Sequence, residues 1–540
     1  MSASLTCTSL AFSWPDGTPV FDGLDLAFGP GRTGLVGVNG SGKSTLLKLI
    51  AGELTPADGA VRVAGEVGHL PQNVTLDTGL KVDEALGIAA RRAALHAIEA
   101  GDVSEEHFET VGDDWGVEER ALATLGELGL GHIGLDRRIG EVSGGESVLL
   151  RLAALLLRRP DVLLLDEPTN NLDLYARRRL YSAVASWPGV MVVVSHDREL
   201  LDLVDQIADL RSGEVTWYGG NFSAYEEALA VEQEAAERMV RVAESDLRRQ
   251  KRELVDAQVK LAHRRRYAQK MYDTKREPRA VMKLKSRAAQ VSAGKHRLMH
   301  EEKLAEAKDR LDEAVEAVRD DDEIRVDLPY TAVPQGRTVL TLMDLHLAHG
   351  ARVKGGLDLR GPERVALIGR NGTGKTTLLR TIAGELPPVS GEATVHVPLR
   401  FLPQRLDVLD GELSVAENVA RFAPGATNNR VRARLARFLF RGARADQRAS
   451  TLSGGERFRA ALAALMLAEP APQLLMLDEP TNNLDIASVR QLTSALESYE
   501  GALVVASHDL PFLESIGITR WLMLDGELRE VTPEDLEFPA

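Results

Sequence analysis

Several kinds of residue are scarce in this chain of 540 residues, and each scarcity excludes a class of protein. The single cysteine, Cys7, excludes a disulfide framework, a four-cysteine zinc site and a cysteine-held iron–sulfur cluster, and it is typical of a reducing compartment. The longest stretch without a charged residue, Leu180 to His196, has 17 residues and contains Pro188 and Gly189, whereas a membrane span needs about 20 apolar residues. No basic residue precedes Arg32, so the charged start of a secretory signal is missing. We therefore expect a cytoplasmic protein that does not enter a membrane.

The composition is otherwise that of a packed globular protein, with 44% hydrophobic and 27% charged residues. At about 150 residues per domain, the length predicts three or four domains. The net charge of −15 taken alone argues against a nucleic-acid partner. However, residues 241–300 hold 18 Lys or Arg against 6 Asp or Glu, a local charge of +12 that leaves −27 on the remainder. One strongly basic segment thus interrupts an acidic chain.

The chain is an internal duplication, because five sequence blocks recur in the same order. The block GLVGVNGSGKSTLLKLIAGEL from Gly34 returns as ALIGRNGTGKTTLLRTIAGEL from Ala366, and VLLLDEPTNNLD returns as LLMLDEPTNNLD. The triplets LPQ and SHD and the tetrapeptide SGGE also recur. Between the glutamine of LPQ and the serine of SGGE the first copy has 22 more residues than the second. Two similar domains are predicted, at 1–225 and 327–540, and the first should carry a helical projection at about 85–125.

The segment between the copies, 226–326, has apolar residues at heptad spacing. Such spacing forms one apolar seam per helix and predicts an antiparallel helical hairpin, whose centre at about 264–297 holds most of the positive charge. The seam positions are Val240, Leu247, Leu254 and Leu261 on the outgoing helix and Leu304, Ala307, Leu311, Ala314 and Val318 on the returning one.

Two glycine-rich loops, GVNGSGKS and GRNGTGKT, follow buried apolar runs that read as parallel strands. Glycines let the backbone N–H groups surround a phosphate at the start of a helix. We expect Lys43 and Lys375 to reach the outer phosphates, and Ser44 and Thr376 to bind Mg²⁺. One such match could be a chance glycine turn, but two matches in equivalent places predict phosphate binding.

Two carboxylates end a hydrophobic strand in each copy. Asp166 and Asp478 suit Mg²⁺ coordination, and Glu167 and Glu479 suit general-base catalysis on a water molecule. The other candidates are His196 and His508, which lie 29 residues after those glutamates and could contact the terminal phosphate, and Gln72 and Gln404, which lie 29 residues after the lysines.

Together these motifs resemble the ATP-binding cassette (ABC) ATPases, with Walker A, Q-loop, SGGE signature, Walker B, D-loop and switch histidine in order. Two cassettes on one chain, DEPTNNLD in both and a charged helical linker resemble the ABC-F family. The resemblance implies two α/β P-loop NTPase domains of ABC type, each with a helical subdomain, joined by a helical hairpin. It implies ATP and Mg²⁺ as cofactors, Gln72 and Gln404 among the metal ligands, and ATP hydrolysis. The two cassettes would close head to tail, so that each signature faces the Walker A loop of the other.

The ATP-binding residues implied by the resemblance comprise two adenine-stacking candidates, Trp14 and His349, together with the loop and signature residues of both copies. In the first copy they are Gly37, Asn39, Gly40, Ser41, Gly42, Lys43, Ser44, Thr45, Gln72, Ser143, Gly144, Gly145 and Glu146. In the second they are Gly369, Asn371, Gly372, Thr373, Gly374, Lys375, Thr376, Thr377, Gln404, Ser453, Gly454, Gly455 and Glu456. The first signature, VSGGESVLLR, departs from the usual pattern, and this leaves open whether the two sites are equivalent.

ABC-F proteins act on ribosomes as translation factors or antibiotic-resistance proteins, and their linker enters from the tRNA exit site towards the peptidyl-transferase centre. The basic hairpin here is accordingly expected to contact rRNA and tRNA, by cations that neutralise phosphates and tyrosines that stack on bases. The candidates are Arg264, Arg265, Arg266, Tyr267, Lys270, Tyr272, Lys275, Arg276, Arg279, Lys283, Lys285 and Arg287.

Other readings of the same sequence are a solvated coiled coil, the ATPase subunit of a drug exporter, and a DNA-associated clamp. A solvated coiled coil fits poorly with a local charge of +12, and an exporter subunit would not need a basic hairpin. The third is disfavoured because the hairpin is short and zinc cysteines are lacking. We therefore predict a monomeric ribosome-associated ATPase with an intramolecular cassette pair and with neither a membrane nor a DNA partner.

Overall fold

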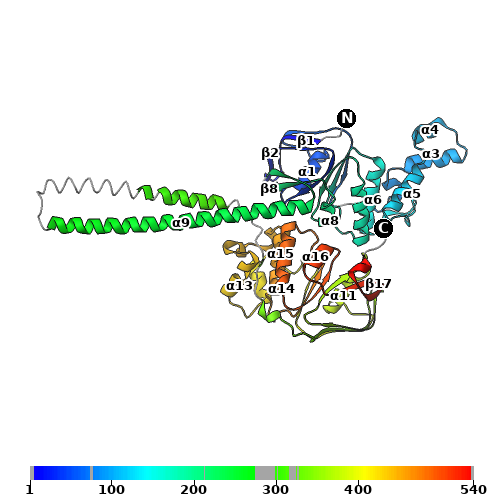
Figure 1. Cartoon of the computed structure of the whole chain (residues 1–540). Helices are drawn as coiled ribbons and strands as arrows, with labels where there is room; N and C mark the ends of the chain where they lie inside the picture. Colours follow the sequence, from blue (N-terminus) through cyan, green and yellow to red (C-terminus); the bar gives the residue numbers. More distant parts are fainter. Residues whose placement is uncertain are drawn as a thin grey trace. The chain divides into compact units, whose positions relative to one another are not determined.

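The computed structural model describes residues 5–72, 77–211, 213–273, 298–300, 302–315, 324, 328–348 and 350–536 (Figure 1). It divides into two compact units, one of residues 1–223 with 323–540 and the other of residues 224–322. The first unit holds two cassettes of similar architecture. Within the described residues, no helix is long and apolar enough to span a lipid bilayer.

The first cassette is built on a six-stranded sheet in the order β5-β6-β7-β3-β8-β9. Its strands are β3 (Gly31–Val36), β5 (Val67–Leu70), β6 (Val162–Asp166), β7 (Val190–Val194), β8 (Gln206–Arg211) and β9 (Glu214–Gly219). All neighbours pair in parallel except β8 and β9. Every residue of β6 and β7 is buried, as expected of strands covered on both faces. The predicted parallel strands are therefore confirmed.

An antiparallel sheet of three strands completes the first cassette, in the order β2-β1-β4. The strands are β1 (Leu5–Ser13), β2 (Pro19–Phe28) and β4 (Asp58–Val63). Their apolar residues share one core with helix α1 (Lys43–Ile50) and with β6 and β7. This packing holds the loop between β3 and α1 in place.

The second cassette repeats the arrangement in one nine-stranded sheet, ordered β13-β10-β11-β18-β17-β12-β16-β15-β14. The strands are β10 (Thr338–His346), β11 (Arg352–Arg360), β12 (Arg364–Ile368), β13 (Ser390–Val395), β14 (Leu399–Leu402), β15 (Leu474–Asp478), β16 (Ala502–Ala506), β17 (Arg520–Asp525) and β18 (Glu527–Val531). A single paired position, Arg352 with Glu527, joins its antiparallel and parallel parts.

Helices accompany the sheets of both cassettes. Those of the first cassette, besides α1, are α2 (Val82–Ala85), α3 (Ala89–Glu99), α4 (Glu105–Val111), α5 (Val117–Glu127), η1 (Ile139–Glu141), α6 (Gly144–Arg158), α7 (Leu174–Ala185) and α8 (Arg198–Leu201). Those of the second are η2 (Pro329–Thr331), α11 (Lys375–Ile382), α12 (Val415–Phe422), α13 (Asn428–Leu435), η3 (Ala436–Phe438), η4 (Gly442–Asp446), η5 (Ala449–Thr451), α14 (Gly454–Met466), α15 (Ile486–Glu497), α16 (Leu510–Ser515) and η6 (Pro533–Leu536).

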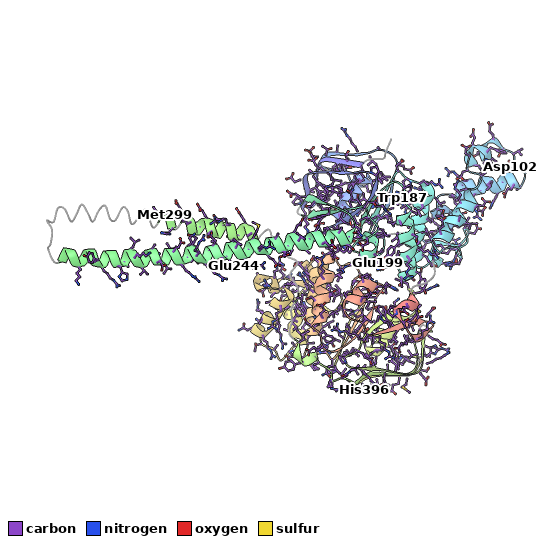
Figure 2. The ribbon with its side chains drawn as sticks, in the orientation of Figure 1. Asp102, Trp187, Glu199, Glu244, Met299 and His396 are labelled. Carbon is purple, nitrogen blue, oxygen red and sulfur yellow. The ribbon has the colours of Figure 1, made fainter. Side chains whose placement is uncertain are left out.

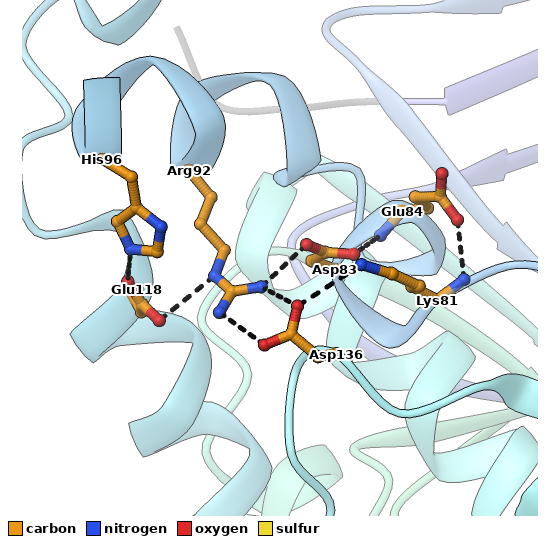
Figure 3. A network of polar contacts seen from close by, with 7 residues as sticks. All are labelled: Lys81, Asp83, Glu84, Arg92, His96, Glu118 and Asp136. Carbon is orange, nitrogen blue, oxygen red and sulfur yellow. Dashed lines mark hydrogen bonds and ion pairs between the residues drawn. The ribbon is translucent and has the colours of Figure 1, made fainter. Parts of the chain in front are cut away.

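The region predicted as a helical projection contains α3, α4 and α5, and a half-buried arginine ties it to the rest of the cassette (Figure 3). The Arg92 guanidinium donates to Asp136 at 2.9 and 3.0 Å, to Asp83 at 2.9 Å and to Glu118 at 3.1 Å. Hydrogen bonding to Asp136 is the largest contribution that raises the pKa of Arg92. His96 adds a contact of 2.8 Å to Glu118. One side chain therefore joins α3 to α2, to α5 and to the loop before η1.

The second unit is formed by the helices between the cassettes. Helix α9 (Phe222–Asp273) has 52 residues, and residues 298–300 and 302–315 are also helical. Figure 2 labels Glu244 on α9 and Met299 on the returning segment. Arg310 donates to Asp246 across the two helices at 2.8 Å. This contact supports the predicted hairpin.

The predicted apolar seam is covered to different degrees along the hairpin. The four outgoing seam residues are half-buried, as are the two returning leucines, while Ala307 and Ala314 are buried. Val318 lies outside the described residues, as do residues 274–297 of the hairpin centre predicted at 264–297. The boundaries predicted at 225 and 327 stay a prediction.

Candidate active site

Each glycine-rich loop has a conformation that its glycines alone permit. Gly37 and Gly369 both have φ of +148°, and a Cβ added there would lie 2.3 Å from the Leu210 carbonyl oxygen and 2.2 Å from that of Leu524. A side chain at either position would collide with the backbone of the neighbouring strand. The loops therefore approach β8 and β17 closely, and α1 and α11 begin directly after them.

The lysines that end the loops are buried and fold back over them. Lys43 Nζ donates to the Gly37 and Val38 carbonyl oxygens at 2.8 and 3.0 Å. Lys375 Nζ donates to the equivalent carbonyls at 2.6 and 3.1 Å and lies 3.0 Å from His508 Nε2. Burial lowers the pKa of both ammonium groups. Each lysine is thus placed over the ring of loop N–H groups where phosphate oxygens would be bound.

The aspartates at the ends of β6 and β15 offer oxygen atoms of the kind that Mg²⁺ prefers. Ser44 Oγ donates to Asp166 Oδ1 at 3.1 Å. Asp478 Oδ2 is buried and has no hydrogen-bond partner among the described residues. Burial raises the pKa of both carboxyl groups. A buried carboxylate beside a hydroxyl fits the octahedral oxygen shell of Mg²⁺, so the residues present suit the metal.

The glutamates that follow these aspartates are held in a strained conformation. Glu167 and Glu479 have φ of 48° and 47°, a region that non-glycine residues seldom occupy, and each N–H donates at 2.8 Å to a neighbouring strand. Glu167 Oε1 lies 3.0 Å from His196 Nε2, and Glu479 Oε1 lies 3.4 Å from His508 Nε2. Such outliers at equivalent positions in both cassettes indicate a functional constraint.

Burial also sets the protonation of these pairs. It raises the pKa of Glu167, raises the pKa of Glu479 to about 7, and lowers the pKa of both histidines. A carboxylate whose pKa lies near neutrality can accept a proton from water at physiological pH, as a general base must. The histidines are neutral, and each can donate or accept one hydrogen bond.

The cleft around Lys375 combines residues of both cassettes, as predicted for head-to-tail closure. It has a volume of about 440 Å³. The first cassette contributes Ser143, Gly144, Gly145, Asn171 and Leu172. The second contributes Asn371, Gly372, Gly374, Lys375, Thr376, Thr377, Gln404, Asp478, Glu479, Asn482 and His508.

The cleft around Lys43 differs, because only residues of the first cassette line it. Its volume is about 290 Å³ and its lining is Trp14, Val20, Asn39, Gly40, Gly42, Lys43, Ser44, Thr45, Gln72, Glu167, Val194 and His196. The second signature, Ser453 to Gly455, is described by the structure and is not part of this lining. Trp14 is at the rim, whereas His349, its predicted counterpart, lies outside the described residues.

Several predicted ATP-binding residues have other contacts in this structure. Glu146 and Glu456 accept hydrogen bonds from the Ser143 and Ser453 N–H groups at 2.7 and 3.0 Å, which caps α6 and α14. Ser41 Oγ is buried without a partner among the described residues. The capping geometry gives the two glutamates a structural role at the signature helices.

The two cassettes contact each other through the asparagines of the glycine-rich loops. The Asn39 N–H donates to Asp485 Oδ2 at 2.9 Å, and the Asn371 N–H donates to Asp173 Oδ2 at 3.2 Å. Their side-chain amides donate to the Asn483 and Asn171 carbonyl oxygens at 3.2 and 2.7 Å. Each loop is therefore joined to the D-loop of the other cassette.

The same aspartates also start a helix within their own cassettes. Asp173 Oδ1 accepts from the Ala176 N–H at 3.0 Å at the start of α7, and Asp485 Oδ1 accepts from the Ser488 N–H at 2.8 Å at the start of α15. One oxygen of each carboxylate thus caps a helix and the other holds the neighbouring cassette.

Sequence reasoning missed Arg177, a buried arginine on α7. Its guanidinium lies 3.4 Å from Asp197 Oδ2, and its positive charge lowers the pKa of Glu479 in the other cassette. The equivalent position of the second cassette is Val489. A comparison of the two D-loop helices would have revealed this difference, but nothing in the sequence places the arginine near a carboxylate more than 300 residues away.

The predicted RNA-binding residues are only partly covered by the structure. Arg266, Tyr267 and Lys270 lie on α9 and are exposed. No side chain is described for Arg264, Arg265 and Tyr272, and the remaining candidates lie outside the described residues: Lys275, Arg276, Arg279, Lys283, Lys285 and Arg287.

Comparison with known proteins identifies the family. The ABC transporter family matches residues 21–170 and 355–482. The tylosin resistance ATP-binding protein TlrC of Streptomyces fradiae is 34% identical over 524 residues, which cover 92% of each chain. The probable ATP-binding protein YheS of Escherichia coli is 31% identical over 542 residues, 96% of this chain and 78% of that protein. The chain belongs to the ABC-F family. As an ABC-F ATPase, it binds and hydrolyses ATP.

Solved structures agree on the fold. The RNase-L inhibitor aligns with 97% of this chain and 89% of its own, with a TM-score of 0.55 and 19% identity. An archaeal ribosome recycling factor, aABCE1, in complex with a ribosomal stalk protein aligns with a TM-score of 0.54 and 18% identity. The predicted fold class of two ABC cassettes in tandem is therefore confirmed.

Proposed function

We propose that the protein is a ribosome-associated ATPase of the cytoplasm, whose cassettes close on ATP and Mg²⁺ and whose basic hairpin contacts rRNA and tRNA. The hairpin would enter near the tRNA exit site and reach the peptidyl-transferase centre, where it modulates translation or displaces a ribosome-targeting antibiotic. The observation that carries the proposal is the charge of the linker, +12 over residues 241–300 in a chain whose remainder is −27. Resistance to tylosin, in the name of a relative of nearly equal length, supports it.

The clefts support a role for each predicted residue. The N–H groups of the glycine-rich loops and the two lysines would hold the phosphates. Ser44 and Asp166 in one cleft, and Thr376 and Asp478 in the other, would hold Mg²⁺ together with Gln72 or Gln404, and the ion would supply positive charge beside the phosphates. Glu167 and Glu479 accept a proton from the attacking water, and the neighbouring histidines hold the terminal phosphate.

The cleft at Lys375 supports closure most directly, because the first signature already lines it. The N-terminus of α6 directs its N–H groups and positive dipole end towards a bound anion. Closure at Lys43 would bring the second signature to that cleft in the same way. Loss of the terminal phosphate on hydrolysis would remove this bridge and reopen the pair.

A trapped variant tests the partner. Changing Glu167 and Glu479 to Gln removes the general base and keeps the size of both side chains, so that ATP should hold the cassettes closed. The protein is then sedimented with ribosomes, with membrane vesicles or with DNA. Co-sedimentation with ribosomes that needs ATP is the expected result. Pelleting with membranes but not with ribosomes would favour an exporter subunit, and pelleting with DNA alone would favour a DNA clamp.

A second experiment tests the hairpin. Changing Arg264, Arg265 and Arg266 to Gln should reduce the slope of ribosome affinity against salt concentration and leave the ATPase activity without ribosomes intact. The matched control changes three arginines of the same helix that form ion pairs with glutamates four residues earlier: Arg238, Arg241 and Arg248. Equal effects of the two triple variants would show that the tip makes no specific contact.

A further inference from the structure

The helical subdomains of the two cassettes carry opposite charges. In the first cassette, residues 89–141 hold 5 Arg against 12 Asp or Glu, a net charge of −7. In the second, residues 415–451 occupy the same place in the repeat and hold 8 Arg against 2 Asp or Glu, a net charge of +6. All eight cations are arginines and none is lysine. The acidic part of the chain therefore contains a second basic region, apart from the hairpin.

Three of these arginines lie on one face of α13 and η3. Arg430, Arg434 and Arg437 follow each other at spacings of four and three residues, which places them one turn apart along a helix. The adjacent face of the helix is buried through Val431, Leu435 and Phe438. The three guanidinium groups have no ion-pair partner among the residues that the structure describes.

Another arginine of the same helix shows the contrast. Arg432 is engaged, because its guanidinium holds Asp446 through two contacts, one of 3.0 Å. The helix thus carries one arginine that is held by an acid of its own subdomain and three for which no such ion pair is seen among the described residues. The positive charge of these three arginines is therefore left for a ligand of the groove.

The three arginines line an open groove of about 720 Å³. Its other walls include Tyr330 of η2, which is 70% exposed, Gln473 before β15, and a single acid, Glu469. Tyr330 belongs to the segment that packs into the cassette core through Ile324 and Leu328, so the ring is held at the rim by an anchored backbone. The groove thus combines a row of cations, one aromatic ring, one amide and one acid, and the rest of its lining is mostly apolar.

We propose that this groove binds RNA, with backbone phosphates on Arg430, Arg434 and Arg437 and an unstacked base on Tyr330. Guanidinium groups form two parallel hydrogen bonds to a phosphate, and an exposed tyrosine ring is a stacking surface for a base. An acidic peptide would use the cations and leave the ring without a partner. The site lies outside both ATP clefts and outside the hairpin, and it does not depend on whether the hairpin binds.

Fluorescence anisotropy with the full chain tests the proposal. The probes are a labelled single-stranded RNA of about 20 nucleotides, measured across a series of salt concentrations, and poly-glutamate of similar length as competitor. The test variant changes Arg430, Arg434 and Arg437 to Gln. Three lost phosphate contacts should reduce the slope of log affinity against log salt by about 2, which corresponds to roughly 100-fold weaker binding at 0.1 M salt.

The matched control removes the same charge from exposed arginines away from the groove, at Arg62 in β4, Arg337 before β10 and Arg352 in β11. The control should retain the wild-type slope, and both triple variants should keep the wild-type melting temperature and ATPase activity without RNA. An unchanged slope in the groove variant, or an equal loss in the control, would overturn the proposal. Poly-glutamate that displaces the RNA at equal charge concentration would reassign the groove to an acidic protein.

Location is tested separately from affinity. RNA that contains 4-thiouridine should cross-link to the peptide that carries Tyr330, and Tyr330→Ala should abolish this cross-link while any cross-link to the hairpin remains. The groove variant with an intact hairpin is compared with the variant at Arg264, Arg265 and Arg266 with an intact groove. Loss of RNA binding in the hairpin variant alone would support the proposed function and refute RNA binding by the groove. Loss of RNA binding in the groove variant alone would support the groove and refute RNA binding by the hairpin.

Discussion

The protonation of Glu479 leads to a prediction about stability that needs no nucleotide. Burial raises the pKa of this carboxyl from its ordinary 4.5 to about 7. The folded state therefore keeps a proton that the unfolded state releases between about pH 4.5 and pH 7, and stability falls as the pH rises through that window. The difference of about 2.5 pH units corresponds to about 3 kcal/mol, since each unit is about 1.4 kcal/mol. Above pH 7 the loss should be complete.

The substitution Glu479→Gln removes the ionisable group and nearly preserves its shape. The variant should equal the wild type at pH 4 and exceed it by about 3 kcal/mol at pH 8. For a cassette of about 200 residues this raises the melting temperature by roughly 6–12 °C. Calorimetry between pH 4 and pH 8, without ATP and Mg²⁺, measures the difference. The difference reports on Glu479 alone, because Glu167 contributes equally to the stability of the wild type and of the variant.

The control is Glu514→Gln, which changes an exposed glutamate on α16 of the same cassette. This variant should follow the wild type at every pH. If Glu479→Gln also follows the wild type between pH 5 and pH 8, the carboxyl is not held in its neutral form by burial, and its assignment as a base poised near neutral pH is refuted.

Four further substitutions test features of the clefts and of the projection. Arg177→Met should move the pH profile of ATP hydrolysis to higher pH, because the Arg177 charge lowers the pKa of Glu479; an unchanged profile would contradict this coupling. Gly369→Ala should abolish fluorescent-nucleotide binding in the second cassette, whereas Gly372→Ala should weaken it less, because only the first new Cβ collides with backbone. Arg92→Met should destabilise the first cassette by about 3 kcal/mol in chemical unfolding, because it leaves a buried acid without its cation; a loss below 1 kcal/mol would argue against a structural role.

Much of the fold could be predicted because the relevant signals are local. The apolar runs before Lys43 and Lys375 identify buried strands, and the loop motif requires a turn followed by a helix, whatever the rest of the chain does. The repeat strengthens both predictions, because a pattern found twice at equal spacing is unlikely to arise by chance. The heptad seam is equally local, and the cross-helix contact of Asp246 with Arg310 agrees with it.

The features that were missed depend on tertiary structure. Arg177 reads as one basic residue on an ordinary helix, and only the fold brings its charge to Glu479. The negative net charge of the whole chain conceals the arginines of α13. The groove becomes visible only in the fold, which brings Tyr330 beside them. The difference between the two clefts is also invisible in motifs that are nearly identical, because it depends on where each signature helix lies.

The double role of Asp173 and Asp485 has a thermodynamic consequence. Each carboxylate ties the start of a helix in one cassette to the phosphate-binding loop of the other. We expect a ligand that shifts one loop to change the free energy of the opposite helix, and linkage requires the influence in the reverse direction to be equal in size. The two ATP affinities are then expected to depend on each other. Whatever factor the first molecule of ATP imposes on the second, the second imposes on the first, even though the two clefts differ in their lining.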